Sequence, residues 1–135
     1  MRTLSSLISC ICLLFSTVVV AADPPYVGKW TVNKDKSTSV PPTLELAIAE
    51  GYDIVVTQGP AILKANFDGR DYHPLAGPET VRISRVGSNG FSMTVSINGK
   101  PVAVDTFMVS DDGQTLTQVG GAFGQPPNHT IVYER

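Results

Sequence analysis

The sequence has very little cysteine and no long run of charge of one sign. Its two cysteines, Cys10 and Cys12, both lie in an apolar N-terminal segment, so the rest of the chain has no thiol for a disulfide or a thiolate metal site. Ten basic residues stand against twelve acidic ones, and neither kind is clustered. This balance argues against a nucleic-acid partner and against binding to an anionic membrane surface.

Residues 1–22 have the pattern of a cleaved secretory signal peptide. Arg2 gives a positive start, the stretch from Leu7 to Val20 is almost wholly apolar, and Val20-Ala21-Ala22 supplies small residues for cleavage. The apolar run barely approaches the roughly 18 to 20 residues that a spanning helix needs. An uncleaved anchor or a lipid on Cys10 is the less favoured alternative. We therefore expect residues 23–135 to form one small domain, periplasmic or secreted, without stable membrane insertion.

Residues that are apolar at every second position predict β-strands in this domain. Phe91, Met93, Val95 and Ile97 alternate with serine and threonine, which is the pattern of a half-buried strand. Asn98-Gly99 follows directly, and this pair tolerates the positive φ angles of a type I′ turn. We therefore expect residues 91–97 and 101–110 to pair as an antiparallel hairpin.

Other apolar segments are separated by turns such as Asp68-Gly69 and Asp111-Asp112-Gly113. The additional strands are expected at 26–33, 44–49, 52–58, 61–67, 70–72, 80–86, 114–119 and 129–134. Residues 43–50 could instead form a short helix, since leucine, glutamate and alanine favour one, but their period of two favours a strand. About eight to ten short strands indicate an all-β fold, either an up-and-down antiparallel barrel or a sandwich. Of these we expect the barrel, because closure removes exposed edges.

Four sets of motifs follow one another along residues 23–135. They are Gly28-Lys29-Trp30-Thr31-Val32-Asn33 with Asp35-Lys36-Ser37, then Asp68-Gly69-Arg70-Asp71-Tyr72-His73-Pro74-Leu75-Ala76-Gly77, then Asp105-Thr106-Phe107 with Ser110-Asp111-Asp112-Gly113-Gln114-Thr115-Leu116-Thr117, and finally Val132-Tyr133-Glu134-Arg135. Together they resemble a family of small secreted bacterial lipocalin-like proteins of uncharacterised function. The resemblance implies a lipocalin-like β-barrel and brings no catalytic residues with it.

The middle of the chain departs from that family in two ways. His73 stands between Tyr72 and Pro74, where the family usually passes straight from tyrosine to proline. The segment 37–68 is also shorter than the family pattern. The barrel could therefore lack a hairpin or be open on one side.

Gly28 and Trp30 are expected to have a structural role. In the lipocalins that this motif resembles, such a tryptophan packs across the closed end of the barrel and a basic side chain covers it. Arg135 or Arg85 could serve here. A cation over an indole ring contributes roughly 0.5 to 2 kcal/mol, so we expect Trp30 to stabilise the fold rather than to contact a ligand.

The polar residues form no evident catalytic or metal-binding pattern. His73 and His129 are far apart in the sequence and lie in loop-like contexts, so we interpret them as solvated, although convergence with Asp71 would favour a site. The aspartates at 68, 71, 111 and 112 are explained as turn formers. No serine lies in a nucleophile elbow. We expect no metal, no cofactor and no catalytic residue, and an enzyme is the least favoured class.

The function that the sequence favours is the binding of a small apolar or amphipathic molecule inside the barrel. The residues expected to point inward are Trp30, Leu46, Ile54, Val56, Leu63, Phe67, Val81, Ile83, Phe91, Met93, Val95, Val104, Leu116 and Ile131. The residues expected to contact a ligand are Phe67, Tyr72, Phe91, Met93, Phe107 and Phe123, the last in an expected mobile loop, Gly120-Gly121-Ala122-Phe123-Gly124. The alternative is a structural or interaction module of the cell envelope with a filled barrel and no ligand. The sequence leaves the oligomeric state open.

Overall fold

The computed structural model describes residues 22–74 and 77–135, which are β-structure apart from loops and one short 3₁₀ helix. Except for Ala22, the expected signal peptide lies outside the described residues. The strands are β1 (Gly28–Val32), β2 (Leu44–Ala49), β3 (Tyr52–Gln58), β4 (Ala61–Ala65), β5 (Glu79–Val86), β6 (Gly90–Ile97), β7 (Lys100–Val109), β8 (Thr115–Ala122) and β9 (His129–Glu134), and the 3₁₀ helix is η1 (Lys34–Lys36). Within the two described ranges, no helix is both long enough and apolar enough to cross a membrane.

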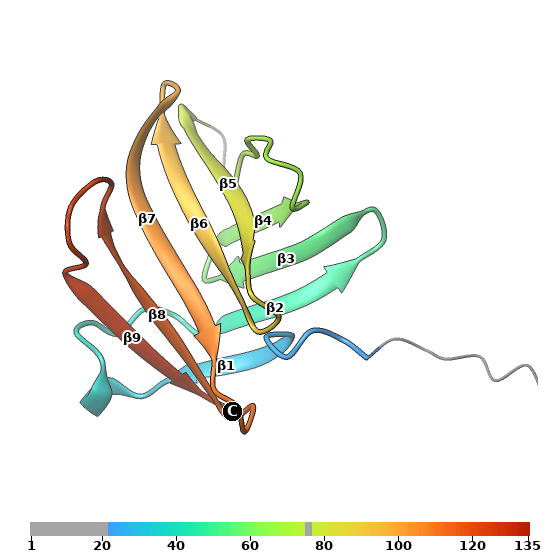
Figure 1. Cartoon of the computed structure of the whole chain (residues 1–135), viewed down its shortest axis with the longest axis vertical. Helices are drawn as coiled ribbons and strands as arrows, with labels where there is room; N and C mark the ends of the chain where they lie inside the picture. The colour runs from blue at the N-terminus through green and yellow to red at the C-terminus, as the bar shows by residue number, and fades with distance from the viewer. Residues whose placement is uncertain (1–21, 75–76) are drawn as a thin grey trace, which may run out of the picture.

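The nine strands form a nearly closed antiparallel barrel (Figure 1). The hydrogen-bonded order is β4-β3-β2-β1-β9-β8-β7-β6-β5, so the chain meanders from β1 to β4 and again from β5 to β9. Pairing of β1 with β9 joins the two meanders. Between β4 and β5 the ring is open, and among the described residues of the intervening segment Tyr72 forms an isolated bridge with Val81 of β5. The expectation of an all-β, partly open barrel is confirmed.

The β6–β7 hairpin forms as the sequence predicts. Asn98 and Gly99 connect Ile97 to its partner Lys100, and their φ angles are 51° and 78°. Positive values at both central positions are those of a type I′ turn. The sequence signal is reliable here because few residue pairs other than Asn-Gly adopt both angles without strain.

A β-bulge changes which residues of β7 face the interior. The pairing of β6 with β7 shifts between Val95 and Ser96, which leaves Val102 as the extra residue on β7. Phe107 is buried, and alternation then places Asp105 on the same inner side and Val104 on the outer side. The expectation that Val104 points inward was wrong, because one extra residue reverses the alternation beyond it.

The expectation of a strand at 70–72 was also wrong. The Tyr72 hydroxyl donates to Asp68 Oδ2 at 2.6 Å, and the Arg70 N–H donates to Asp68 Oδ1 at 3.0 Å. These local hydrogen bonds turn the chain at the position where a hairpin with β4 was expected. Tyr72 therefore bridges to β5 and not to β4.

Several element boundaries differ from the expected ones by a few residues. Residues 44–49 form β2, so the alternative helix at 43–50 is excluded. β1 is shorter than the expected 26–33, and β4 ends at Ala65, where the next two residues bond to Asp53 instead. β8 extends to Ala122, so Gly120 and Gly121 belong to a strand and not to the mobile loop that we expected.

Aromatic side chains fill one end of the barrel. Tyr26, Trp30 and Phe91 are at most 2% exposed. The Phe91 ring stacks on Phe107 at 4.8 Å between centroids and meets the edge of Tyr26 at 5.2 Å. The Trp30 Nε1–H donates to the Tyr26 carbonyl at 2.9 Å, so the polar group of the indole is satisfied although the ring is buried.

Arg135 covers the Trp30 ring from outside, with its guanidinium carbon 4.2 Å from the ring centroid. The guanidinium also donates to the carbonyls of Gly113, Val27 and Pro25 at 2.7, 2.8 and 2.9 Å. One side chain therefore ties the β7–β8 turn to the segment before β1. We call the region of Tyr26, Trp30, Phe91 and Arg135 the closed end.

Gly28 makes room for this arrangement. A Cβ atom at Gly28 would lie 2.9 Å from Arg135 Nη1, and its φ of 146° is in the region that favours glycine. The glycine of the Gly-x-Trp motif thus lets the Arg135 side chain pass close to the backbone, and the Arg135 guanidinium covers the Trp30 ring. Arg85, the other residue considered for this role, lies over Phe67 at 4.3 Å.

Candidate binding site

Three residues form a row across the inner face of β7, β8 and β9. The strand register places Asp105 opposite Gly120 and Gly120 opposite His129. A Cβ atom at Gly120 would collide with the Asp105 carboxylate. Because glycine stands between them, Asp105 Oδ1 reaches His129 Nε2 at 2.5 Å. His129 begins the strand expected at 129–134, but its side chain is paired with a carboxylate, so its interpretation as a solvated residue was wrong.

A chain of hydrogen bonds connects this pair with β3. Gln118 Nε2 donates to Asp105 Oδ1 at 3.2 Å, and Gln118 Oε1 accepts from the Tyr133 hydroxyl at 2.8 Å. Gln58 Nε2 donates to the same hydroxyl oxygen at 3.0 Å. Gln58 thus donates to Tyr133, Tyr133 donates to Gln118, and Gln118 donates to Asp105. All three hydrogen bonds therefore point the same way, from Gln58 to the Asp105 carboxylate.

Tyr133 is the buried member of this chain. Burial raises the pKa of its hydroxyl, the hydrogen bond from Gln58 lowers it, and the Asp105 carboxylate raises it further. The net pKa lies above the ordinary value, so the hydroxyl keeps its proton at neutral pH and can donate to Gln118. The orientation of the Gln118 amide follows from that donation.

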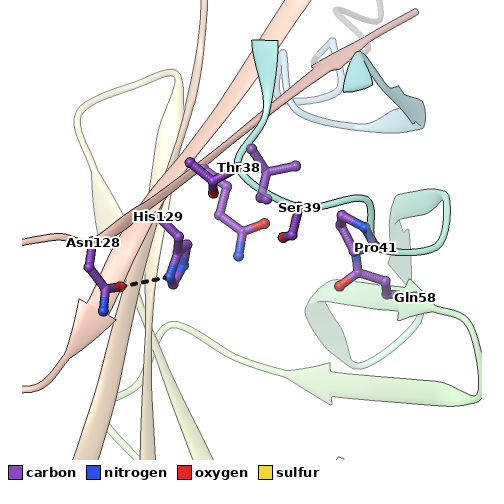
Figure 2. A pocket seen from close by; sticks show the side chains of 8 residues that line it. Thr38, Ser39, Pro41, Gln58, Asn128 and His129 are labelled. Atoms are coloured by element: carbon purple, nitrogen blue, oxygen red, sulfur yellow. Dashed lines mark hydrogen bonds between the residues drawn. The ribbon is translucent and has the colours of Figure 1, made fainter. Parts of the chain in front are cut away.

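A polar cavity of about 400 Å³ lies beside His129. Figure 2 shows Asn128 and His129 on one side of it and the segment with Thr38, Ser39 and Pro41 on the other. The Thr38 N–H donates to the Thr130 carbonyl at 2.8 Å, and this holds the segment against β9. The lining residues are Thr38, Ser39, Pro41, Gln58, Gln118, Asn128, His129 and Ile131. The volume falls within the roughly 300 to 1,000 Å³ of typical ligand sites.

A second and mostly apolar cavity of about 210 Å³ lies across the opening between β4 and β5. Its lining residues are Val56, Gln58, Ala61, Leu63, Pro74, Glu79, Val81, Met93 and Val95. Gln58 lines both cavities, so they adjoin at its side chain. Its Nε2 donates to Tyr133 and to the Pro42 carbonyl, whereas its Oε1 takes part in no hydrogen bond among the described residues.

Three of the residues expected to contact a ligand lie inside the barrel. Met93 lines the apolar cavity and is half-buried. Phe91 and Phe107 are buried and stack on each other, so they fill the core. They line neither of the two cavities.

The other three lie outside both cavities, although Phe67 and Tyr72 pack against the hydrophobic core. Phe67 is half-buried beneath the Arg85 guanidinium, and Tyr72 is half-buried and bonded to Asp68. Phe123 follows β8 and is 52% exposed. None of these three lines the polar or the apolar cavity.

The remaining polar candidates are not brought together. His73 is exposed, and Asp71 pairs with Arg82 at 3.2 Å. Among the residues that the structure describes, no group of three or more histidine, cysteine, aspartate or glutamate side chains is placed to hold a metal ion. Asp112 lies in the β7–β8 turn, where it accepts from the Ser110 hydroxyl at 2.6 Å and from the Gln114 N–H at 3.1 Å.

Sequence reasoning missed Gln58, Asp105 and Gln118 as site residues. Each occupies an inward-facing or cavity-lining strand position that a purely apolar core would fill with a hydrophobic side chain. That signal is visible only once the strand register is known, and the bulge in β7 hides it for Asp105. Comparison with known proteins adds no assignment: no family model, no curated protein and no solved structure matches this chain.

Proposed function

We propose that the protein binds a small amphipathic molecule in the polar and apolar cavities, which together we call the open half of the barrel. The observation that carries this proposal is that Gln58 lines both the apolar and the polar cavity. An apolar group would pack against Leu63, Val81 and Met93, where burial stabilises by roughly 25 cal/mol per Å². A polar group would then lie between Gln58 and His129, whose side chains face the adjoining space.

The test is titration with N-decyl dansylamide, an uncharged amphiphile whose fluorescence reports an apolar environment. We expect saturable binding to the wild-type protein. Val95→Phe should weaken it about tenfold, because the added ring occupies the apolar cavity and roughly 1.4 kcal/mol of contact is lost. Val102→Phe is the matched control, since Val102 is 40% exposed on the outer surface. Absence of saturable binding to the wild-type protein would overturn the proposal.

A second function is favoured by exposed apolar side chains at the rim. Ile97, Val102 and Phe123 are 42%, 40% and 52% exposed. The Phe123 N–H donates to the Val102 carbonyl at 3.0 Å, so the β8–β9 loop lies beside β7. A protein partner that recognises this rim would make the barrel an interaction module of the cell envelope. If Phe123→Ala abolished binding to a purified protein partner and Val95→Phe did not, this function would be favoured over ligand binding.

We further propose that the protein is exported and that residues 1–22 are removed. The support is the sequence pattern of a short positive start, an apolar run and small residues at 20–22. N-terminal sequencing of the protein recovered from outside the cytoplasm should begin at Asp23. Recovery of the intact N-terminus in the cytoplasm would contradict export.

A further inference from the structure

The carboxylate side chains at and beside the two cavities are those of Glu79 and Asp105. Glu79 lines the apolar cavity near its opening and is exposed. Asp105 bonds to Gln118 and His129, which both line the polar cavity, and it pairs in register with Met93, which lines the apolar one. Asp105 therefore adjoins lining residues of both cavities, although it is not itself a lining residue of either. Neither cavity has a lysine or an arginine among its described lining residues.

The sign of this charge does not depend on the protonation of His129. With a neutral imidazole, the Asp105 and Glu79 carboxylates leave two negative charges at the cavities. With an imidazolium, His129 balances Asp105 and the Glu79 charge remains. Nearby basic side chains are engaged elsewhere: Arg85 lies over Phe67 and Arg82 pairs with Asp71.

The hydrogen-bonding groups at the junction of the cavities are also mainly acceptors. Gln58 uses Nε2 for both of its hydrogen bonds, which leaves Oε1 as an acceptor. Both hydrogen bonds to the Asp105 carboxylate fall on Oδ1, which leaves Oδ2 as another acceptor. An alkylammonium group has three N–H donors and no acceptor, whereas a carboxylate has acceptors alone.

We propose that the ligand is a cationic amphiphile with a primary ammonium head group and a short alkyl body. This inference rests on the proposed function, and it specifies the chemical class of the ligand. The alkyl body lies in the apolar cavity, and the ammonium group donates to Gln58 and Asp105. A fatty acid of the same length is disfavoured, because its carboxylate meets at least one like charge in either state of His129 and no lysine or arginine among the described lining residues.

The test compares decylamine, decanol and decanoate by isothermal titration calorimetry at neutral pH and low ionic strength. These probes share their chain and differ in head-group charge. We expect decylamine to bind about tenfold more tightly than decanoate, with decanol between them, and the difference should shrink as salt is added. Equal affinities, or tighter binding of decanoate, would overturn this inference and leave the proposed function standing. Failure of all three probes to bind would overturn the proposed function itself.

Charge-neutral variants locate the effect. Glu79→Gln should reduce the preference for decylamine over decanoate about twofold to threefold, and it should fold normally because Glu79 is exposed. Asp105→Asn should reduce the preference further. Asp111→Asn removes the same charge from an exposed residue in the β7–β8 turn, so it controls for net charge and should keep the full preference. If all three variants changed the preference equally, the cavity carboxylates would not be its source.

Discussion

The closed end and the open half are built from the same strands but differ in polarity. Towards the closed end, the inward residues of β7, β8 and β9 are Val109, Leu116 and Tyr133, which pair across the three strands and are buried. Further along the same faces, the residues are Asp105, Gly120 and His129. Apolar packing therefore holds one end together, and a hydrogen-bonded polar row replaces it at the other. We therefore expect substitutions at the closed end to change mainly stability, and substitutions in the open half to change mainly ligand binding.

The strongest test of this separation is Trp30→Ala. Trp30 is fully buried, so truncation should cost about 3 to 5 kcal/mol of unfolding free energy, measured by urea denaturation. The exposed Phe123→Ala serves as the control and should change stability by no more than about 0.5 kcal/mol. Equal losses in the two variants would break the distinction between the ends.

Gly120→Ala tests the polar row. The added methyl group would collide with the Asp105 carboxylate and the Val104 carbonyl, so we expect a loss of about 1 to 3 kcal/mol and displacement of His129 from Asp105. NMR of the His129 ring would report the displacement. The penalty should be smaller in an Asp105→Ala background, because one of the two colliding groups is then gone. An equal penalty there would show that the carboxylate is not what requires glycine.

Arg135→Ala should act on stability and leave ligand binding intact. It removes the cation over Trp30 and three hydrogen bonds to carbonyls, but the side chain is partly solvated, so we expect a loss of about 1 to 2 kcal/mol. Arg135→Lys should recover only part of this loss, because an ammonium group lacks the planar fork of the guanidinium. The affinity for N-decyl dansylamide should be unchanged in both variants. A fall in that affinity would couple the two ends.

The smallest effect on stability is expected when the pH is lowered and Asp112 in the β7–β8 turn becomes protonated. The Ser110 hydroxyl and the Gln114 N–H hold the pKa of Asp112 below its ordinary value. Since the pKa of the folded state is below that of the unfolded state, Asp112 stabilises the fold above about pH 4 and loses this contribution as the pH falls through the folded pKa. Asp112 is exposed, so the change in stability should be slight. Ser110→Ala should raise the Asp112 pKa in an NMR titration, whereas Ser39→Ala in the open half should not.

The sequence was sufficient for what local chemistry decides. Alternation in 91–97 and the Asn98-Gly99 turn predicted the β6–β7 hairpin, because turn angles and side-chain alternation are properties of short segments. The prediction of a strand at 70–72 was wrong, because the Asp68 carboxylate accepts hydrogen bonds from Tyr72 and Arg70, which a strand pattern does not reveal. Local patterns thus gave most of the strands and the antiparallel barrel.

The site could not be predicted in the same way. His129, Gly120 and Asp105 meet only because three strands pair in one register, and the bulge at Val102 reverses the alternation on which that register depends. Gly-Gly in 120–121 was interpreted as part of a mobile loop, whereas Gly120 leaves space between the Asp105 and His129 side chains. Long-range register, rather than residue type, creates the site.

The opening between β4 and β5 has a topological consequence. Around the barrel, the covalent chain is interrupted between β9 and β1, whereas the hydrogen-bonded sheet is interrupted between β4 and β5. β4 and β5 are connected by the chain and not by strand pairing, whereas β9 and β1 are connected by pairing at Thr31 with Glu134 and Val32 with Tyr133. A proteolytic cut between β4 and β5 would therefore yield two fragments whose paired strands meet at the β1–β9 seam, with side-chain contacts such as Gln58 with Tyr133 beside it. Size-exclusion chromatography of the cut protein would show whether these non-covalent contacts hold the halves of the barrel together.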